Sequence, residues 1–386
     1  MIGSNIASMP LRPFITGLSL TPALLLSSLH AQTDHPSSTA QVTRAIAVYE
    51  CTGDLGHPTA ARLIPISLFI NGQLQDAGVY LAQPIPFALQ PGTLYLIQQA
   101  GQPTGALNIQ SARTIPSTTA PAWIAYGRFL TPAEATAATT PPPSPVTLPA
   151  DTDATPAPPN PKKKTKQQAY VTPPTTPILD DPDRPILQSN QPAAPTTPPE
   201  LTTLPSDLHQ ATAVSDAANR PPENFTYTWP STSARDQILQ ALEALALPPL
   251  THYIAFNHLT SASTPSSTLT NAHLLAYTLN EIPTYILTAK APLITNGPIY
   301  LTLIAQPAPN NQLHATLLSI TDAAHLDRTP RLLPIDAVDP DATSRASLLF
   351  ELRSQTTRQF ALYTLTSTPP QQILLTTPIE SSPPTN

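Results

Sequence analysis

The sequence has a single cysteine, Cys51, among its 386 residues, so an intramolecular disulfide is excluded. A zinc or iron–sulfur site built from several cysteines is excluded for the same reason. Glycine is also scarce, and Gly297 is the only one beyond Gly127. A phosphate-binding loop needs glycine where the backbone approaches the anion, so the last two thirds of the chain cannot supply one.

Charge is scarce as well. Charged residues make up 11% of the chain and the net charge is −6, so a basic stripe for DNA or RNA is lacking and nucleic-acid binding is not expected. Proline, in contrast, is abundant, with 51 residues. This proline content predicts that much of the chain is not packed, and the length leaves room for two modest domains.

Residues 1–31 have the order of a secretory signal peptide. A short polar stretch with Arg12 precedes the apolar run Phe14 to Leu26, and the small residue Ala31 ends the segment. The run is too short to span about 30 Å of hydrocarbon, and Pro22 interrupts it. We expect cleavage after Ala31, export to the periplasm or the outside of the cell, and no membrane span in the mature chain.

Residues 42–130 alternate short apolar runs with turn residues, which predicts a small all-β domain. Asn71-Gly72 is the strongest local signal, because both central positions of a type I′ hairpin turn need positive φ. Cys51 lies in this region and is expected to be a lone buried thiol. The expected strands are Arg44–Glu50, Arg62–Ile70, Leu74–Leu81, Leu94–Ile97, Leu107–Ile109 and Trp123–Phe129.

Residues 131–230 hold nearly half of the prolines, together with many threonines. Proline fixes φ and donates no backbone hydrogen bond, so we expect a disordered linker that holds two compact domains apart. Its one charge cluster is Lys162–Lys166. A solvated patch is the favoured interpretation, and attraction to anionic cell-wall polymers or lipid is the alternative.

Residues 231–378 are expected to form an α+β domain with a mostly antiparallel sheet. Ser231-Thr232-Ser233 offers N-caps for a helix that should end before Pro248-Pro249. Asn310-Asn311 indicates a hairpin turn, Ala272–Asn280 fits a helix or a strand, and a frayed tail should start at Pro378. The expected strands are His252–His258, Tyr285–Ala289, Ile299–Ala305, Leu313–Ile320, Leu332–Val338, Leu348–Leu352, Phe360–Thr364 and Ile373–Thr376.

Segments from all three regions occur together in one group of proteins. They are Ala61–Pro65, Asp76–Ala82, Pro86–Leu89, Asp181–Pro185, Asp322–Pro330 and Ile335–Asp339. With these segments the chain resembles uncharacterised exported bacterial proteins that pair a small N-terminal β domain with a C-terminal domain across a proline-rich spacer. The resemblance implies the same mainly β architecture and carries no activity.

The loop that begins at Asp339 resembles the calcium loop of FG-GAP repeats, which place oxygen ligands at positions one, three, five and nine and glycine at position six. Asp339 and Asp341 fit the first two ligand positions. Thr343, Ser344 and Ser347 occupy the fifth, sixth and ninth. Because Ca²⁺ takes six to eight oxygen ligands, we expect a degenerate, metal-free turn, with weak calcium binding as the alternative.

The chain shows no compact catalytic motif. HExxH and GxSxG are both missing, and His252 and His258 are six residues apart on an expected strand, too far for shared metal ligation. Glu243 and Glu281 lack a partner carboxylate in sequence for glycosidase chemistry. We therefore assign no catalytic, cofactor-binding or metal-binding residue, and a triad assembled from distant serines or threonines stays open.

The remaining candidates concern binding. Trp123 and Tyr126 could form an aromatic sugar platform, but three residues along a strand place them on opposite faces, which favours core packing for at least one. We expect a non-enzymatic envelope or interaction protein, with an envelope protein or a cell-wall polymer as partner. The alternative is an exported hydrolase with a site in the C-terminal domain, for which a deep pocket with converging polar side chains would be the sign.

Overall fold

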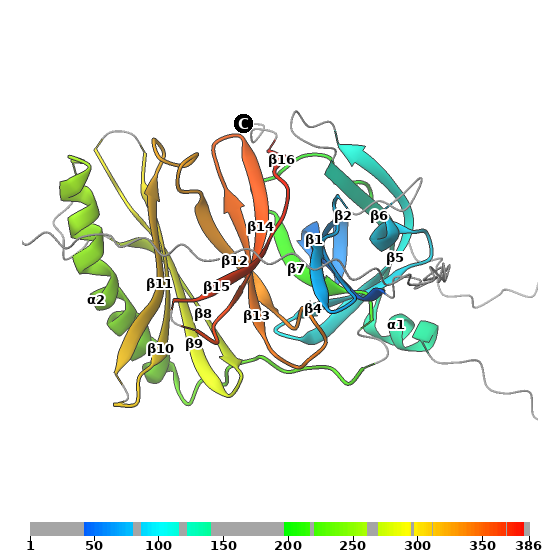
Figure 1. Cartoon of the computed structure of the whole chain (residues 1–386), viewed down its shortest axis with the longest axis horizontal. Helices are drawn as coiled ribbons and strands as arrows, with labels where there is room; N and C mark the ends of the chain where they lie inside the picture. Colours follow the sequence, from blue (N-terminus) through cyan, green and yellow to red (C-terminus); the bar gives the residue numbers. More distant parts are fainter. Residues whose placement is uncertain are drawn as a thin grey trace, which may run out of the picture. The chain divides into compact units, whose positions relative to one another are not determined.

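The computed structural model of the chain describes residues 42–79, 86–115, 122–139, 197–216, 220–260, 269–294, 297–310, 312–367 and 369–381. In these ranges the elements form three antiparallel sheets with two α-helices (Figure 1). The mainly β fold expected from the sequence is thereby confirmed. The expected signal peptide and the cluster Lys162–Lys166 lie outside the described residues.

The first sheet closes into a barrel. Its order is β1-β7-β4-β5-β6-β2-β3, and β1 also pairs with β2, so that six strands form the ring. The seventh strand, β3, pairs with β2 as an antiparallel hairpin. The strands are β1 (Val42–Asp54), β2 (His57–Ile70), β3 (Gln73–Asp76), β4 (Leu94–Gln99), β5 (Gln102–Ile115), β6 (Ala122–Leu130) and β7 (His209–Val214). The hairpin turn between β2 and β3 is confirmed, since Asn71 has φ 49° and Gly72 has φ 76°.

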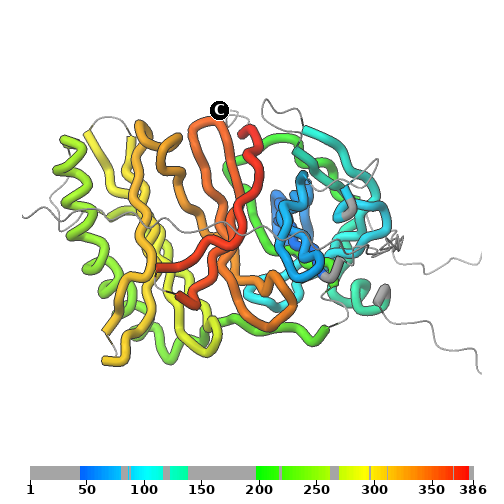
Figure 2. Tube along the Cα trace, in the orientation of Figure 1, coloured from blue at the N-terminus to red at the C-terminus, as the bar shows by residue number. Residues whose placement is uncertain are grey.

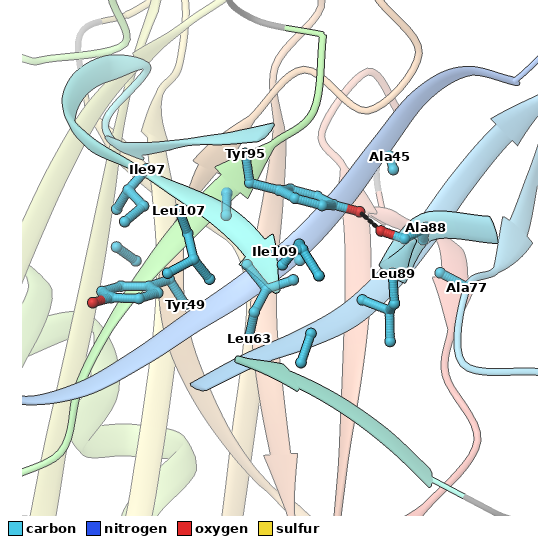
Figure 3. Packing of buried hydrophobic residues seen from close by; sticks show 14 of the residues in the cluster. Ala45, Tyr49, Leu63, Ala77, Ala88, Leu89, Tyr95, Ile97, Leu107 and Ile109 are labelled. Carbon is cyan, nitrogen blue, oxygen red and sulfur yellow. Dashed lines mark hydrogen bonds between the residues drawn. The ribbon is translucent and has the colours of Figure 1, made fainter. Parts of the chain in front are cut away.

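Alternate residues of β1 fill the barrel interior. Ala45 and Tyr49 are buried in one cluster with residues of the other strands (Figure 3), and Cys51 belongs to the same cluster. The 3-10 turn η1 (Phe87–Leu89) contributes to this core, and the Tyr95 hydroxyl donates to the carbonyl of Ala88 at 2.7 Å. The expectation of a lone buried thiol is confirmed, because Cys51 is free and fully buried.

Strand β7 corrects the expected limits of the linker. It falls within residues 131–230, yet it pairs with both β1 and β4 and lies beside β1 in the trace (Figure 2). At the start of the same range, helix α1 (Pro132–Thr139) is formed. Proline density hid both elements, and β7 offers no alternating pattern because Ala211 to Val214 are all buried. Residues 140–196 lie outside the described residues.

The C-terminal part contains two antiparallel sheets. In the second sheet the order is β11-β10-β9-β8, formed by β8 (Thr270–Leu279), β9 (Ile282–Ala291), β10 (Ile299–Pro307) and β11 (Leu313–Asp322). The third sheet consists of β12 (Arg331–Val338), β13 (Ser347–Arg353), β14 (Thr357–Thr364), β15 (Gln371–Leu375) and β16 (Ile379–Glu380). The segment Ala272–Asn280, which fitted either a helix or a strand, is therefore part of strand β8. The frayed tail expected from Pro378 onward instead begins with β16, which pairs with β14.

Helix α2 (Thr232–Phe256) covers the outer face of the second sheet. Ser231 caps it by accepting from the amide of Ala234, as expected. The expected end was wrong, because the helix runs through Pro248-Pro249 and takes in the expected strand His252–His258 up to Phe256. Burial of Leu250 against the sheet explains the continuation, since packing can outweigh the local cost of proline. Among the described helices, none has the length and apolar character needed to cross a membrane.

The outer face of the barrel packs directly on the third sheet. Ile46, Val48 and Ile64 of the barrel share one hydrophobic cluster with Phe360 and Leu362 of β14. The other face of the third sheet packs against the second sheet through residues such as Phe350 and Ile286. The two folded parts are thus not held apart, and the described residues group as one compact unit. Because β1 and β2 have apolar residues on both faces, their outer faces need to be covered, and the third sheet covers them.

Candidate functional site

A cluster of buried charges joins the barrel to the third sheet. Glu50 of β1 is fully buried, and it accepts from Arg62 Nε on β2 at 2.6 Å and from both terminal nitrogens of Arg358 on β14. Glu351 of β13, also fully buried, accepts from Arg358 Nη2 at 3.1 Å and from Arg353 Nε at 2.7 Å. We call these five residues the seam cluster, in which three guanidinium groups meet two carboxylates.

Glu50 and Arg358 of the seam cluster stay charged near neutral pH. Burial alone would raise the pKa of Glu50, but Arg358 and Arg62 outweigh it and lower that pKa to about 2. Burial alone would lower the pKa of Arg358, and the facing carboxylates of Glu50 and Glu351 raise it instead. Groups whose pKa values lie so far from neutrality do not exchange protons during a reaction, so the cluster is suited to structure rather than to acid–base chemistry.

A second polar group surrounds Glu223, in the segment that follows β7. Burial, together with the charge of Asp339, raises the pKa of Glu223 to about 7. Arg44 donates to Asp216 at 2.7 Å, and its guanidinium lies 3.3 Å from the carboxylate of Asp339. A carboxyl group that titrates near neutrality is a candidate acid or base. The pocket beside it measures about 20 Å³, which is room for a water molecule and not for a substrate.

The calcium-like loop is closed by its own backbone. Asp339 is buried, and its carboxylate accepts from the amides of Asp341, Thr343 and Ser344 at 2.9–3.3 Å. Ser344 has φ 62°, the left-handed region in which a loop of this type usually has glycine. Arg44 adds a positive charge at the same carboxylate. The oxygens that would face an ion are therefore engaged by amides and by a guanidinium.

A third group lies where β11 ends. Asp322 is 1% exposed, and it accepts from Tyr253 Oη at 3.0 Å and from the amide of Ala324 at 2.8 Å. His325 Nδ1 lies 2.9 Å from the same carboxylate, while about a third of the His325 side chain is exposed. A buried carboxylate that orients a histidine ring supplies two of the three members of a nucleophile-activating triad. In the described part of the chain, the ring hydrogen-bonds only with Asp322 and Tyr253, so no nucleophile completes it.

The residues considered from the sequence do not come together. His252 lies on α2, where its ring stacks at 6.2 Å on Phe256, and His258 follows the end of that helix. Trp123 packs in the barrel interior and Tyr126 on its outer face, which confirms that they lie on opposite faces. Among the described residues, no group of three or more histidine, cysteine, aspartate or glutamate side chains is arranged to hold a metal ion.

Strand β11 has one edge along which no described strand pairs. β11 is the terminal strand of the second sheet and pairs only with β10. From Leu313 to Thr321 it has no charged residue and no proline, and Leu318 is 37% exposed. Edge strands in soluble proteins are commonly protected by lysine, proline or a covering segment.

The seam cluster escaped sequence reasoning because its members come from strands that are distant in the sequence. Glu50 and Arg358 are 308 positions apart, in the strands β1 and β14. A charged residue within a strand was the one available signal, but a sequence does not say which opposite charge will face it. The chemistry assigned to these residues therefore rests on their geometry in this chain. No family model, no curated protein and no solved structure matches the chain.

Proposed function

We propose that the chain is an exported, non-enzymatic protein of the cell envelope that acts by binding another polypeptide along the edge of β11. Export rests on the order of residues 1–31 and on the resemblance to exported bacterial proteins. The observation that carries the binding role is the edge of β11 along which no described strand pairs. The pockets support it, because those beside the barrel and the third sheet measure only about 20–40 Å³, far below the several hundred usual for ligand sites.

The edge of β11 is prepared for strand addition. β10 pairs along the strand and α2 packs on the same sheet, so the edge is held in an extended form before a partner arrives. An added strand would gain main-chain hydrogen bonds, and Leu318 would offer an apolar contact at one position. Without charges between Leu313 and Thr321, the edge best fits an uncharged extended segment of the partner.

Site-specific photo-crosslinking in the producing cells tests this role. A photoreactive amino acid is placed at Leu318, and in a matched protein at Ile282, which is 46% exposed at the start of β9 in the same sheet. We expect a covalent adduct with an envelope protein at position 318 and none at position 282. Adducts of equal yield at both positions, or none at position 318, would contradict the proposal.

Leu318→Lys gives a second test, because a charge on an edge strand blocks strand addition while the side chain stays solvated. The adduct formed from a neighbouring photoreactive position, Ser319, should fall at least tenfold in this variant. Ile282→Lys, the matched control, should leave the yield unchanged. Unfolding midpoints of both variants establish that each remains folded.

One observation favours a hydrolase as the second candidate, namely the buried Asp322 that orients His325. If this pair activates a nucleophile supplied by a substrate or by water, purified mature protein should cleave activated esters, and His325→Ala should remove the activity. His314→Ala, at an exposed histidine of β11, is the control. Equal background rates for the three proteins would exclude this candidate.

A further inference from the structure

A row of arginines crosses the third sheet at one end of its strands. Arg331 of β12 lies directly opposite Arg353 of β13, and Arg353 lies directly opposite Arg358 of β14. Residues paired in this way in an antiparallel sheet share one face and have Cβ atoms about 5 Å apart, and like charges at such positions destabilise the pairing. These three residues, which we call the arginine row, therefore need negative charge close by.

The carboxylates near the arginine row are used at its inner end. Glu50 and Glu351 face Arg62 and Arg358, so the buried charges of the seam cluster balance without help from outside. Arg353 shares Glu351 through Nε alone, and its side chain is a third exposed. Among the described residues, no further carboxylate pairs with Arg353, so the outer end of the row carries excess positive charge.

Arg331, at the outer end of the row, lies beside a second cation. Its guanidinium is stacked on the ring of Tyr300 of β10, 4.4 Å from the ring centroid, and the amino group of Lys290 on β9 lies 5.9 Å from the same centroid. Neither Arg331 nor Lys290 forms an ion pair within the described part of the chain. Burial lowers the pKa of Arg331, and the charge of Arg353 lowers it further, as expected for a cation that lacks a compensating acid.

We propose that Arg331 and Arg353 bind one phosphate group between them, with Lys290 adding positive charge. Guanidinium groups present pairs of N–H donors that match phosphate oxygens. Phosphate is favoured over a carboxylate because it has three acceptor oxygens and a charge of up to −2, which matches the uncompensated charges of Arg331 and Lys290. Since Arg353 is a third exposed, free phosphate and the phosphate of a lipid headgroup can both reach the site.

Thermal unfolding of the purified protein in sodium phosphate and in sodium chloride of equal ionic strength tests the proposal. We expect phosphate to raise the midpoint in a saturable way, by about 3 °C, because it binds only the folded chain. Arg331→Gln should remain folded, since it removes one of two opposed like charges, and should lose the difference between the salts. Arg345→Gln changes the net charge equally at an exposed arginine of the loop between β12 and β13, and should keep the difference.

Flotation with lipid vesicles distinguishes the two sources of the phosphate. Binding to phosphatidylglycerol vesicles that is lost in Arg331→Gln and kept in Arg345→Gln would support the site and assign it to a lipid headgroup. A phosphate response with the same dependence on Arg331, but without vesicle binding, would support the site and assign it to a soluble phosphate. The proposal would be overturned if neither response occurs, or if both are as large in Arg331→Gln as in the wild-type protein.

Discussion

Glu50 shows how this fold tolerates a fully buried charge. Removing a carboxylate from water costs several kcal/mol, and a single ion pair often fails to compensate for that cost. Here two guanidinium groups bind the same carboxylate, and the side chain of Gln210 donates to it as well at 2.9 Å. Because its pKa is lowered to about 2, the contribution of Glu50 is present above the ordinary carboxylate range and is lost as the pH falls toward 2.

Glu50→Gln should be among the most damaging single substitutions. It keeps the shape of the side chain but leaves Arg62 and Arg358 buried with one carboxylate fewer, so we expect a loss of about 3–5 kcal/mol in the free energy of unfolding. Denaturant unfolding measures the loss. Glu200→Gln is the matched control, since its pair with Arg113 is about half exposed and should cost less than about 1 kcal/mol. Equal losses of stability in Glu50→Gln and Glu200→Gln would contradict the structural role assigned to Glu50.

Asp336 has the opposite pH behaviour. It is 5% exposed and accepts from the amides of Ala100 and Ala337 and from the hydroxyl of Thr212. Burial outweighs these hydrogen bonds and raises its pKa from 3.8 to about 6. Between pH 4 and pH 6 the folded chain therefore holds a proton that the unfolded chain has released.

The stability due to Asp336 should consequently fall as the pH rises from about 4 to about 6 and stay level above that window. In Asp336→Asn this group no longer titrates. The free energy of unfolding of the wild type minus that of the variant should decrease by up to about 3 kcal/mol across the window. Urea unfolding at pH 4, 5, 6 and 7 measures the difference. A difference that is constant with pH would show that Asp336 is charged throughout.

At the scale of the element, strands with a strong alternating pattern were predictable and elements fixed by their neighbours were not. The hairpin at Asn71-Gly72 needs only local chemistry, so the sequence was enough for it. The end of α2 was set by burial of Leu250 against the second sheet, and β7 by the gap between β1 and β4. The seam cluster was out of reach for the same reason, because its members meet only after the strands have paired.

Pro248 should still cost stability within α2. It is exposed, it lacks the amide that would bond to the carbonyl of Ala244, and its ring crowds the preceding turn. We expect Pro248→Ala to raise the free energy of unfolding by about 1–3 kcal/mol. Pro132→Ala is the control, because Pro132 is the first residue of α1, where no intrahelical bond is lost, and the change there should be nil or slightly unfavourable. A lower free energy of unfolding in Pro248→Ala would instead show that this proline stabilises the helix.

At the scale of the whole molecule, the prediction of two separate domains failed because composition does not reveal what covers a strand face. β1 buries residues on both faces, with Tyr49 inside the barrel and Val48 against the third sheet. A strand that is apolar on both faces needs a partner on each side. The proline-rich stretch suggested a spacer, but the strand that follows it, β7, completes the barrel that precedes it.

Cutting the chain within residues 140–196 should therefore leave the two fragments joined. β7 belongs to the C-terminal fragment and pairs between β1 and β4 of the N-terminal one, while Glu50 and Arg358 pair across the same division. With a protease site inserted there, we expect the cleaved fragments to co-elute in size-exclusion chromatography and to unfold in one transition. In Ala213→Asp, which puts a carboxylate at a fully buried position of β7, the fragments should separate after cleavage. Separation of the wild-type fragments into two folded species would instead show that the barrel is complete without β7.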